Sequence, residues 1–111
     1  MGDRGNVCVR QEPHDVWLYT HSSGTELADT VRAALAKKWR WNDEMYLTRI
    51  IFEQMIDGAY RQDTGFGIGT KGHDNNHPVV YVDPDKQTVT ISGEVQSFEQ
   101  FIDVVTVEQG G

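Results

Sequence analysis

The chain has a single cysteine, Cys8, so an internal disulfide and every cysteine-rich class of zinc site are excluded by number alone. Because Cys8 lies between valines, we expect a buried, unreactive thiol. No apolar run approaches the roughly 18 residues that a membrane-spanning helix needs. Residues 1–6 also lack the apolar core of a signal peptide. These absences predict a soluble, cytoplasmic protein with no membrane partner.

Positive charge is scarce as well, since the formal net charge of the 111 residues is −7 at pH 7. Binding to a phosphate backbone depends on Lys and Arg, so direct nucleic-acid binding is not expected. The charge is uneven: residues 30–41 contain four bases and no acid, whereas residues 83–111 contain six acids and one base. This acidic quarter predicts contact with the basic surface of another protein. The predicted partner-binding residues are Asp83, Asp85, Glu94, Glu99 and Asp103.

Strand signals fall in two groups along the sequence. Each group has two β-rich runs separated by residues with turn chemistry, which is the pattern of a hairpin. A glycine-rich stretch between the groups is a further strand candidate. The predicted strands cover residues 6–11, 16–20, 64–69, 79–83 and 87–92.

Helical periodicity predicts a first helix over residues 25–38 and a second over 43–58, with Asn42 as its cap. Apolar residues cover too much of the second helix for a surface stripe, so we expect it at the centre of the fold. The sequence Ser-Phe-Glu-Gln at 97–100 fits a capping box and predicts a short C-terminal helix.

These elements together predict an α+β fold with an antiparallel sheet of four to five strands, built from two hairpins. Two central helices and the short C-terminal helix complete the prediction. The sheet is expected to be antiparallel because parallel pairs would need crossover helices between successive strands. A single domain over residues 1–107 contains all of these elements, and residues 108–111 form a flexible tail.

A polar loop with two histidines is the first candidate for a metal or acid–base site. Imidazole and carboxylate groups suit zinc or another divalent cation. No rigid helix fixes their spacing, however, and such residues in a loop commonly serve turn geometry and solvation. We therefore expect no metal, no cofactor and no catalytic residue. The alternative, an enzyme site, would gather Arg4, His21, Glu26, His73, Asp74 and His77.

Glycine marks two further motifs. Residues 65–72 resemble a phosphate loop but lack the Gly-Lys-Ser/Thr ending that opens a helix. A strand whose glycines let another backbone or a bulky aromatic approach closely is the favoured interpretation. The terminal Gly110-Gly111 resembles the end of ubiquitin-like modifiers, but two successive helices do not match their single long helix. A flexible end is expected there.

Residues 37–41, Lys-Lys-Trp-Arg-Trp, interleave cations with indoles. This composition can stack bases and neutralise phosphates. It is equally typical of a helix end followed by two tryptophans that anchor a turn between helices. In a chain that is acidic overall, we favour the structural interpretation.

Short motifs extend over most of the chain, roughly residues 1–92. They are Met-Gly-Asp-Arg-Gly-Asn-Val at 1–7, Leu-Tyr-Thr-His at 18–21 with Gly24 and Glu26-Leu27, Arg40-Trp41, Tyr46-Leu47, residues 49–52, residues 64–68, and Asp74 with His77-Pro78. In these motifs the chain resembles a family of small uncharacterised proteins encoded by phages and by bacterial and archaeal genomes. The resemblance implies a compact domain that is often encoded together with mobile genetic elements. Small acidic proteins of such elements frequently bind host proteins.

The sequence thus favours a non-enzymatic protein-binding module, in particular a phage-type inhibitor of a host defence or nucleic-acid-handling protein. Carboxylates spaced along a hairpin and a helix can imitate a phosphate array and compete for a basic groove. The alternative is a small-molecule or metal-assisted enzyme with a site around His21, Glu26 and the 73–77 loop. A cleft holding these groups within hydrogen-bond reach would favour the enzyme.

Overall fold

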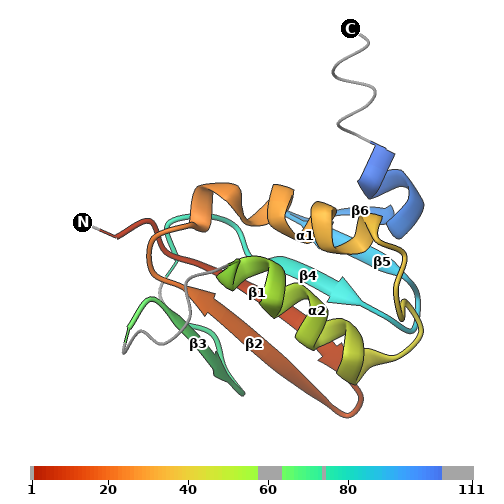
Figure 1. Ribbon diagram of the computed structural model, residues 1–111, viewed down its shortest axis with the longest axis horizontal. Helices are drawn as coiled ribbons and strands as arrows, with labels where there is room; N and C mark the ends of the chain where they lie inside the picture. Colours follow the sequence, from red (N-terminus) through yellow and green to blue (C-terminus); the bar gives the residue numbers. More distant parts are fainter. Residues whose placement is uncertain (1, 58–63, 74, 104–111) are drawn as a thin grey trace, which may run out of the picture.

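The computed structural model describes residues 2–57, 64–73 and 75–103. It shows an α+β fold, which confirms the predicted class, with one sheet in the spatial order β3-β2-β1-β4-β5-β6. Helices α1 and α2 contact each other and lie on the same face of the sheet (Figure 1). Residues 98–103 are also helical. The other elements are β1 Gly5–Gln11, β2 His14–Thr20, the 3-10 helix η1 Gly24–Glu26, α1 Leu27–Ala36, α2 Glu44–Ile56, β3 Phe66–Gly69, β4 Val80–Asp83, β5 Thr88–Ile91 and β6 Glu94–Ser97.

The predicted sheet of four to five antiparallel strands with two central helices is wrong. The six-stranded sheet is mixed, because β1 and β4 pair in parallel, with Val7 opposite Val80. The prediction assumed that parallel partners must be successive strands. Here β2, both helices and β3 lie between β1 and β4 in the chain, so the helices belong to a long crossover. They form a layer over one face of the sheet.

Strand β6 has no counterpart among the predicted strands. Its sequence, Glu-Val-Gln-Ser, lacks the regular alternation of apolar and polar residues that marks a half-buried strand. The strand follows β5 through a two-residue turn, in which Ser92 and Gly93 have φ values of 52° and 81°. Two positive φ values are typical of the type I′ hairpin turn, so the Ser-Gly pair is the sequence signal for this strand.

The local strand predictions are confirmed. Strands β1 and β2 form the first antiparallel hairpin, and β4 and β5 form the second. The glycine-rich stretch forms the edge strand β3, which pairs with β2. Just beyond β3, a Cβ on Gly72 would lie 2.8 Å from the ring of Trp17, so a glycine here does allow close approach of an aromatic side chain.

Helix α2 begins at Glu44, one residue later than predicted. Asp43, not Asn42, is the N-cap, and its Oδ1 accepts a hydrogen bond from the amide of Tyr46 at 3.1 Å. Met45 and Tyr46 are 72% and 49% exposed. The helix therefore buries only one face. The prediction of a central, largely buried helix overestimated the width of this buried face.

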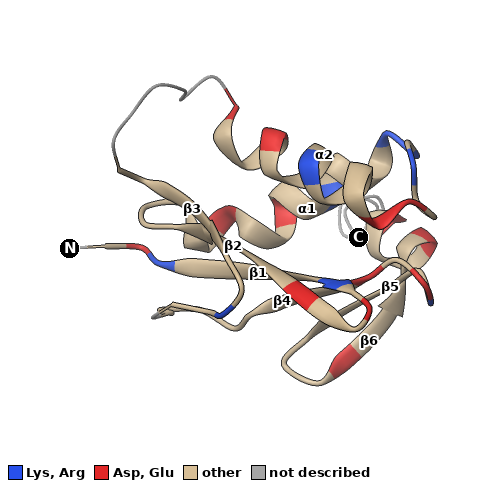
Figure 2. Cartoon of the chain, turned by 90° about the horizontal axis from the view of Figure 1, so that it is seen from below, with Lys and Arg blue, Asp and Glu red and all other residues tan. Residues whose placement is uncertain are grey.

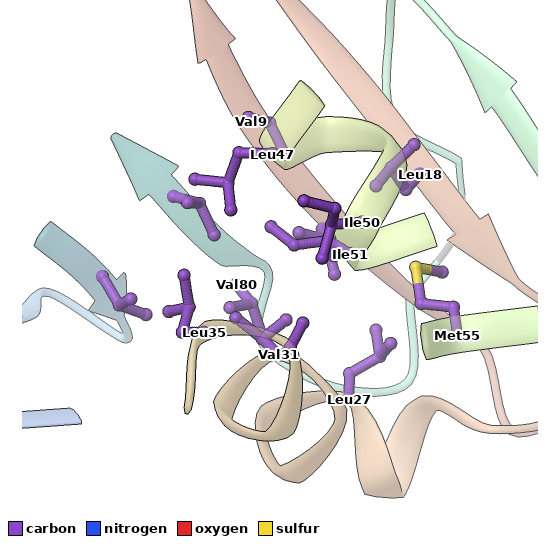
Figure 3. Packing of buried hydrophobic residues seen from close by; sticks show 14 of the residues in the cluster. Val9, Leu18, Leu27, Val31, Leu35, Leu47, Ile50, Ile51, Met55 and Val80 are labelled. Atoms are coloured by element: carbon purple, nitrogen blue, oxygen red, sulfur yellow. The ribbon is translucent and has the colours of Figure 1, made fainter. Parts of the chain in front are cut away.

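The core lies between the sheet and the helices (Figure 3). Helix α2 contributes Leu47, Ile50, Ile51 and Met55, which pack with apolar residues of α1 and of the strands. None of the helices in the described part of the chain is long and apolar enough to cross a membrane.

The predicted capping box closes the C-terminal side of the core. Ser97 Oγ accepts a hydrogen bond from the amide of Gln100 at 3.0 Å, and Gln100 Oε1 accepts one from the amide of Ser97 at 2.9 Å. This reciprocal cap starts the helical turn that buries Phe98 and Phe101. The predicted flexible tail over 108–111, which includes the terminal Gly-Gly, lies outside the described residues.

Candidate functional site

In the part of the chain that the structure describes, one face of the sheet carries no helix, and we call it the open face. Helices α1 and α2 lie on the other side (Figure 2). Because side chains alternate along a strand, every second residue points to the open face. The strand register places a row of such residues side by side across five strands: Trp17, Cys8, Tyr81, Thr90 and Val95.

A hollow of about 350 Å³ lies on the open face, and we call it the sheet hollow. Cys8, Tyr81, Thr90 and Val95 line it. Tyr81 and Val95 are 46% and 61% exposed, although both are large hydrophobic side chains. The ring of Tyr81 is held edge-on against Trp17, with the ring centroids 6.2 Å apart. The hollow therefore offers an accessible and oriented aromatic ring.

Four charged residues also line the sheet hollow: Arg10, Asp15, Asp83 and Lys86. Asp83 Oδ1 accepts a hydrogen bond from the backbone amide of Lys86 at 3.2 Å, which fixes this carboxylate at the β4–β5 turn. Arg10 is paired with Glu12, whose Oε2 lies 2.5 Å from its Nε, and this contact raises the pKa of Arg10. The charges of Asp15 and Asp83 add to this shift, so Arg10 interacts with Glu12 and with both carboxylates of the hollow.

Cys8 is buried between the aromatic residues of the open face, as the sequence predicts. Burial, together with the neighbouring Asp15 carboxylate, raises the pKa of the Cys8 thiol to about 12. The thiol is therefore protonated at neutral pH, and a thiol in that state is a poor nucleophile. Cys8 contributes shape and polarity to the sheet hollow rather than covalent chemistry.

The residues of the predicted alternative site are only partly brought together. His77 Nε2 contacts Asp3 Oδ1 and also lies 3.2 Å from Thr25 Oγ1. Asp3 Oδ2 in turn accepts a hydrogen bond from the amide of Thr25 at 3.0 Å. We call Asp3, Thr25 and His77 the N-terminal clamp. It ties the start of the chain to η1 and to the 75–77 loop.

Among the other described members of the predicted enzyme site, His21 and His73 share one neighbour, Tyr19, and His21 and Arg4 both flank Gly2. His21 Nδ1 lies 3.2 Å from the hydroxyl of Tyr19, and the ring of His73 packs against the ring of Tyr19 at 5.0 Å. Arg4 joins the 75–77 loop through its backbone, and Glu26 is exposed in η1. Asp74 lies outside the described residues.

The N-terminal clamp does not have the geometry of a hydrolytic triad. Such a triad needs the acid on one imidazole nitrogen and the nucleophile on the other. Here Asp3 and Thr25 both meet the same nitrogen of His77, Nε2, so proton transfer through the ring is not set up. Within the described residues, no three His, Cys, Asp or Glu side chains are grouped so that they could hold a metal ion.

Asn6, which the sequence analysis did not single out, fixes the loop that carries two of these histidines. Its side chain is fully buried. Its Nδ2 donates hydrogen bonds to His73 O at 3.1 Å and to Asn75 Oδ1 at 2.5 Å, and its Oδ1 accepts one from the amide of His73 at 3.2 Å. The available signal is a polar side chain inside the otherwise apolar run Asn-Val-Cys-Val. The role of this buried amide is structural.

The acids predicted to bind a partner do not form one array. Only Asp83 lines the sheet hollow. Asp85 lies in the β4–β5 turn, whereas Glu94 starts β6 beyond the other end of β5. Glu99 and Asp103 are in the C-terminal helical turn, where Glu99 lies 3.6 Å from the ammonium group of Lys38. In Figure 2 the acidic residues are accordingly spread over several elements, with basic residues among them.

The two tryptophans of the 37–41 motif have different roles. Trp41 Nε1 donates a hydrogen bond to Leu35 O at 3.0 Å, and its ring packs edge-on against Phe98 at 5.2 Å. It anchors the turn between the helices, as the structural interpretation predicts. Trp39 is 58% exposed, so the same interpretation does not account for it.

The fold and the sheet hollow define an α+β domain whose candidate binding surface is an open sheet face. Comparisons with protein-family models, with curated proteins and with solved structures find no match. The resemblance of residues 1–92 to the phage and prokaryotic family stays a prediction. Function is therefore argued from the site itself.

The contacts of the N-terminal clamp affect the pKa of Asp3, which can be measured. Hydrogen bonds from the hydroxyl and the amide of Thr25, and then from His77, lower the pKa of Asp3 below its ordinary value of 3.8. Replacing Thr25 with valine removes the hydroxyl but keeps the amide, so the pKa of Asp3 should rise towards 3.8 in a carboxyl-carbon NMR titration.

Because folding lowers the pKa of Asp3, the stability of the fold depends on pH. The stability that the Asp3 contacts contribute is present above the unfolded-state pKa and is lost as the pH falls through the lower, folded-state pKa. Glu26→Gln, a change of an exposed carboxylate in the same 3-10 helix, should leave the Asp3 titration unchanged. An unaltered Asp3 pKa in Thr25→Val would contradict the described contacts.

Proposed function

We propose that this chain is a non-enzymatic protein-binding module that receives an arginine or lysine side chain of its partner in the sheet hollow. The observation that supports this proposal is an exposed tyrosine ring, Tyr81, beside two carboxylates in one hollow of about 350 Å³. The carboxylates belong to Asp15 and Asp83. Pockets of this size bind ligand groups well when a few polar groups converge on an apolar wall.

The chemistry of the lining suits a cationic side chain with an aliphatic stem. A guanidinium group is attracted to the face of a tyrosine ring and forms charge-assisted hydrogen bonds with carboxylates. The exposed Val95 offers an apolar contact for the stem. Both cations in the lining compete for the carboxylates: Lys86, and Arg10, which pairs with Glu12 and also interacts electrostatically with Asp15 and Asp83.

The remaining predicted partner-binding acids support the proposal through long-range attraction. Asp85, Glu94, Glu99 and Asp103 lie on several sides of the molecule, so they cannot all contact one partner patch. Together with the net charge of −7 they draw in a basic surface and repel duplex DNA. A phage-type inhibitor in the cytoplasm that covers the basic groove of a host defence or nucleic-acid-handling protein would act in this way.

The proposal is tested with a pair of short peptides that differ in one charge. A capped peptide with a central arginine is titrated into labelled protein and followed by amide NMR, and a second peptide carries the neutral isostere citrulline. We expect saturable shifts at Tyr81, Thr90 and Val95 with the arginine peptide. The citrulline peptide should bind at least about tenfold more weakly, because it loses the charge-assisted contacts.

Two matched carboxylate variants locate the contact. Asp83→Asn removes one charge inside the sheet hollow and should weaken binding of the arginine peptide at least about fivefold. This loss is within the range for removing a hydrogen bond to a charged group. Glu94→Gln removes one charge outside it and should change the affinity by less than about twofold. Equal binding of both peptides, or shifts centred away from the open face, would refute the proposed function.

A further inference from the structure

A second hollow lies on the helix side of the sheet, where the connection between α1 and α2 meets the first turns of α2. Its volume is about 520 Å³, within the range of small-molecule sites. We call it the helix hollow. It is lined by Lys38, Trp39, Arg40, Tyr46, Arg49 and Ile50.

Cations and aromatic rings alternate around the helix hollow. The guanidinium carbon of Arg40 lies 4.8 Å from the centre of the Tyr46 ring, and that of Arg49 lies 6.0 Å from it. The ammonium group of Lys37 lies 5.0 Å from the centre of the Trp39 ring. Trp39 and Tyr46 are 58% and 49% exposed, so both rings still present accessible surface. These stacked groups form a flat, positively charged platform.

The charge of this platform is only partly balanced from within the chain. Arg49 pairs with Glu53 at 2.7 Å, and Lys38 lies 3.6 Å from Glu99. No carboxylate of the residues described in the structure lies within salt-bridge distance of Arg40. Arg40 is therefore the guanidinium group best placed to accept an external anion.

The backbone around Trp39 is held in an uncommon conformation. Lys38 and Arg40 have φ values of 59° and 56°, in the left-handed region that residues with long side chains rarely adopt. Such conformations persist where the surrounding structure holds them, and they are frequent at ligand-binding positions. The two residues in this conformation are the cations that precede and follow the exposed Trp39 in the chain.

We propose that the helix hollow binds a nucleoside monophosphate. The base would stack on Trp39, as bases do on exposed aromatic side chains. The phosphate would pair with the guanidinium group of Arg40, which suits a phosphate through two parallel hydrogen bonds. The exposed indole, the adjacent guanidinium group and the size of the hollow are the three observations that together select a planar ring carrying an anion.

The ligand expected in the helix hollow is a single nucleotide and not a nucleic-acid strand. A strand gains its affinity from many phosphates, and its repulsion from a chain of net charge −7 grows with each of them. One phosphate needs only the local cations of the helix hollow. The site is separate from the sheet hollow, which is lined by none of the same residues, so either site can fail without the other.

The test uses adenosine monophosphate, adenosine and inorganic phosphate as probes, followed by calorimetry and by the indole N–H signal of Trp39. We expect adenosine monophosphate to bind saturably and to shift the Trp39 signal. Adenosine and phosphate should each bind at least about tenfold more weakly, because each makes only half of the contacts. An oligoadenylate strand that binds more tightly than the single nucleotide would overturn the commitment to a mononucleotide.

Three variants separate a binding role from a structural one. Arg40→Gly removes the guanidinium group, and glycine adopts a φ of 56° without strain, so the fold should be as stable while nucleotide affinity falls at least about tenfold. Trp39→Ala should cause a similar loss. Lys71→Ala removes an exposed cation outside both hollows and should have no effect beyond about twofold. Unchanged affinity in Arg40→Gly, or no saturation by about 10 mM nucleotide, would refute the site.

Discussion

Replacing Ile51 with alanine should lower the free energy of unfolding by about 2–5 kcal/mol, the range for truncating a well-packed aliphatic side chain. Ile51 is fully buried in α2, and its side chain lies among those of the core residues in Figure 3. Alanine removes three carbon atoms and leaves a cavity between the helix layer and the sheet. Denaturant unfolding monitored by circular dichroism measures the loss.

Met45 provides the matched control on the same helix. It is 72% exposed, so Met45→Ala should change the free energy of unfolding by less than about 0.5 kcal/mol. The contrast tests the orientation of α2, because both substitutions shorten an apolar side chain in one helix. Similar losses for the two variants would mean that the buried face of α2 is misplaced.

Local signals in the sequence carry reliable information in this chain. The first hairpin follows from β-rich runs on either side of residues 12–15, and the capping box at 97–100 forms with both of its hydrogen bonds. Each of these features depends on residues at most about fifteen positions apart, so propensity and spacing suffice to find them. The α+β class follows from the order of such elements.

Nonlocal pairing could not be predicted in the same way. The parallel contact of β1 with β4 joins residues about seventy positions apart, and no pattern within either strand specifies the partner. Strand β6 is short, lies at the sheet edge and contains no buried residue, so it needs no alternating apolar pattern. The assumption that parallel partners must be successive strands therefore gave the wrong sheet.

The candidate sites show the same limit. Asp83 was predicted for its charge, but several of its neighbours in the sheet hollow, Cys8, Asp15 and Thr90 among them, come from other strands through the sheet register. The 37–41 motif was noticed for its composition, which does not distinguish its two tryptophans. Trp41 packs against Phe98, more than fifty residues away, whereas Trp39 is 58% exposed, so the tertiary structure shows which indole packs against the core.

Replacing Asn6 with leucine should lower the free energy of unfolding by about 1–3 kcal/mol, the cost of leaving buried polar groups without a partner. Leucine has a similar volume and fills the fully buried position, so packing is largely kept. The change removes all three hydrogen bonds of the side chain, two of which satisfy the N–H and C=O of His73. The loop around His73 should then open to solvent, and hydrogen exchange of the His73 amide should accelerate at least about tenfold.

Asn75→Ala is the matched control, because it removes only the 2.5 Å contact from Asn6 Nδ2 and leaves both bonds to the His73 backbone. It should cost less than about 1 kcal/mol and keep the His73 amide protected. If Asn6→Leu is as stable as the wild type and the His73 amide exchanges no faster, the buried amide does not hold the loop. The hydrogen bonds between the Asn6 side chain and the His73 backbone would then not explain why the ring of His73 lies against Tyr19.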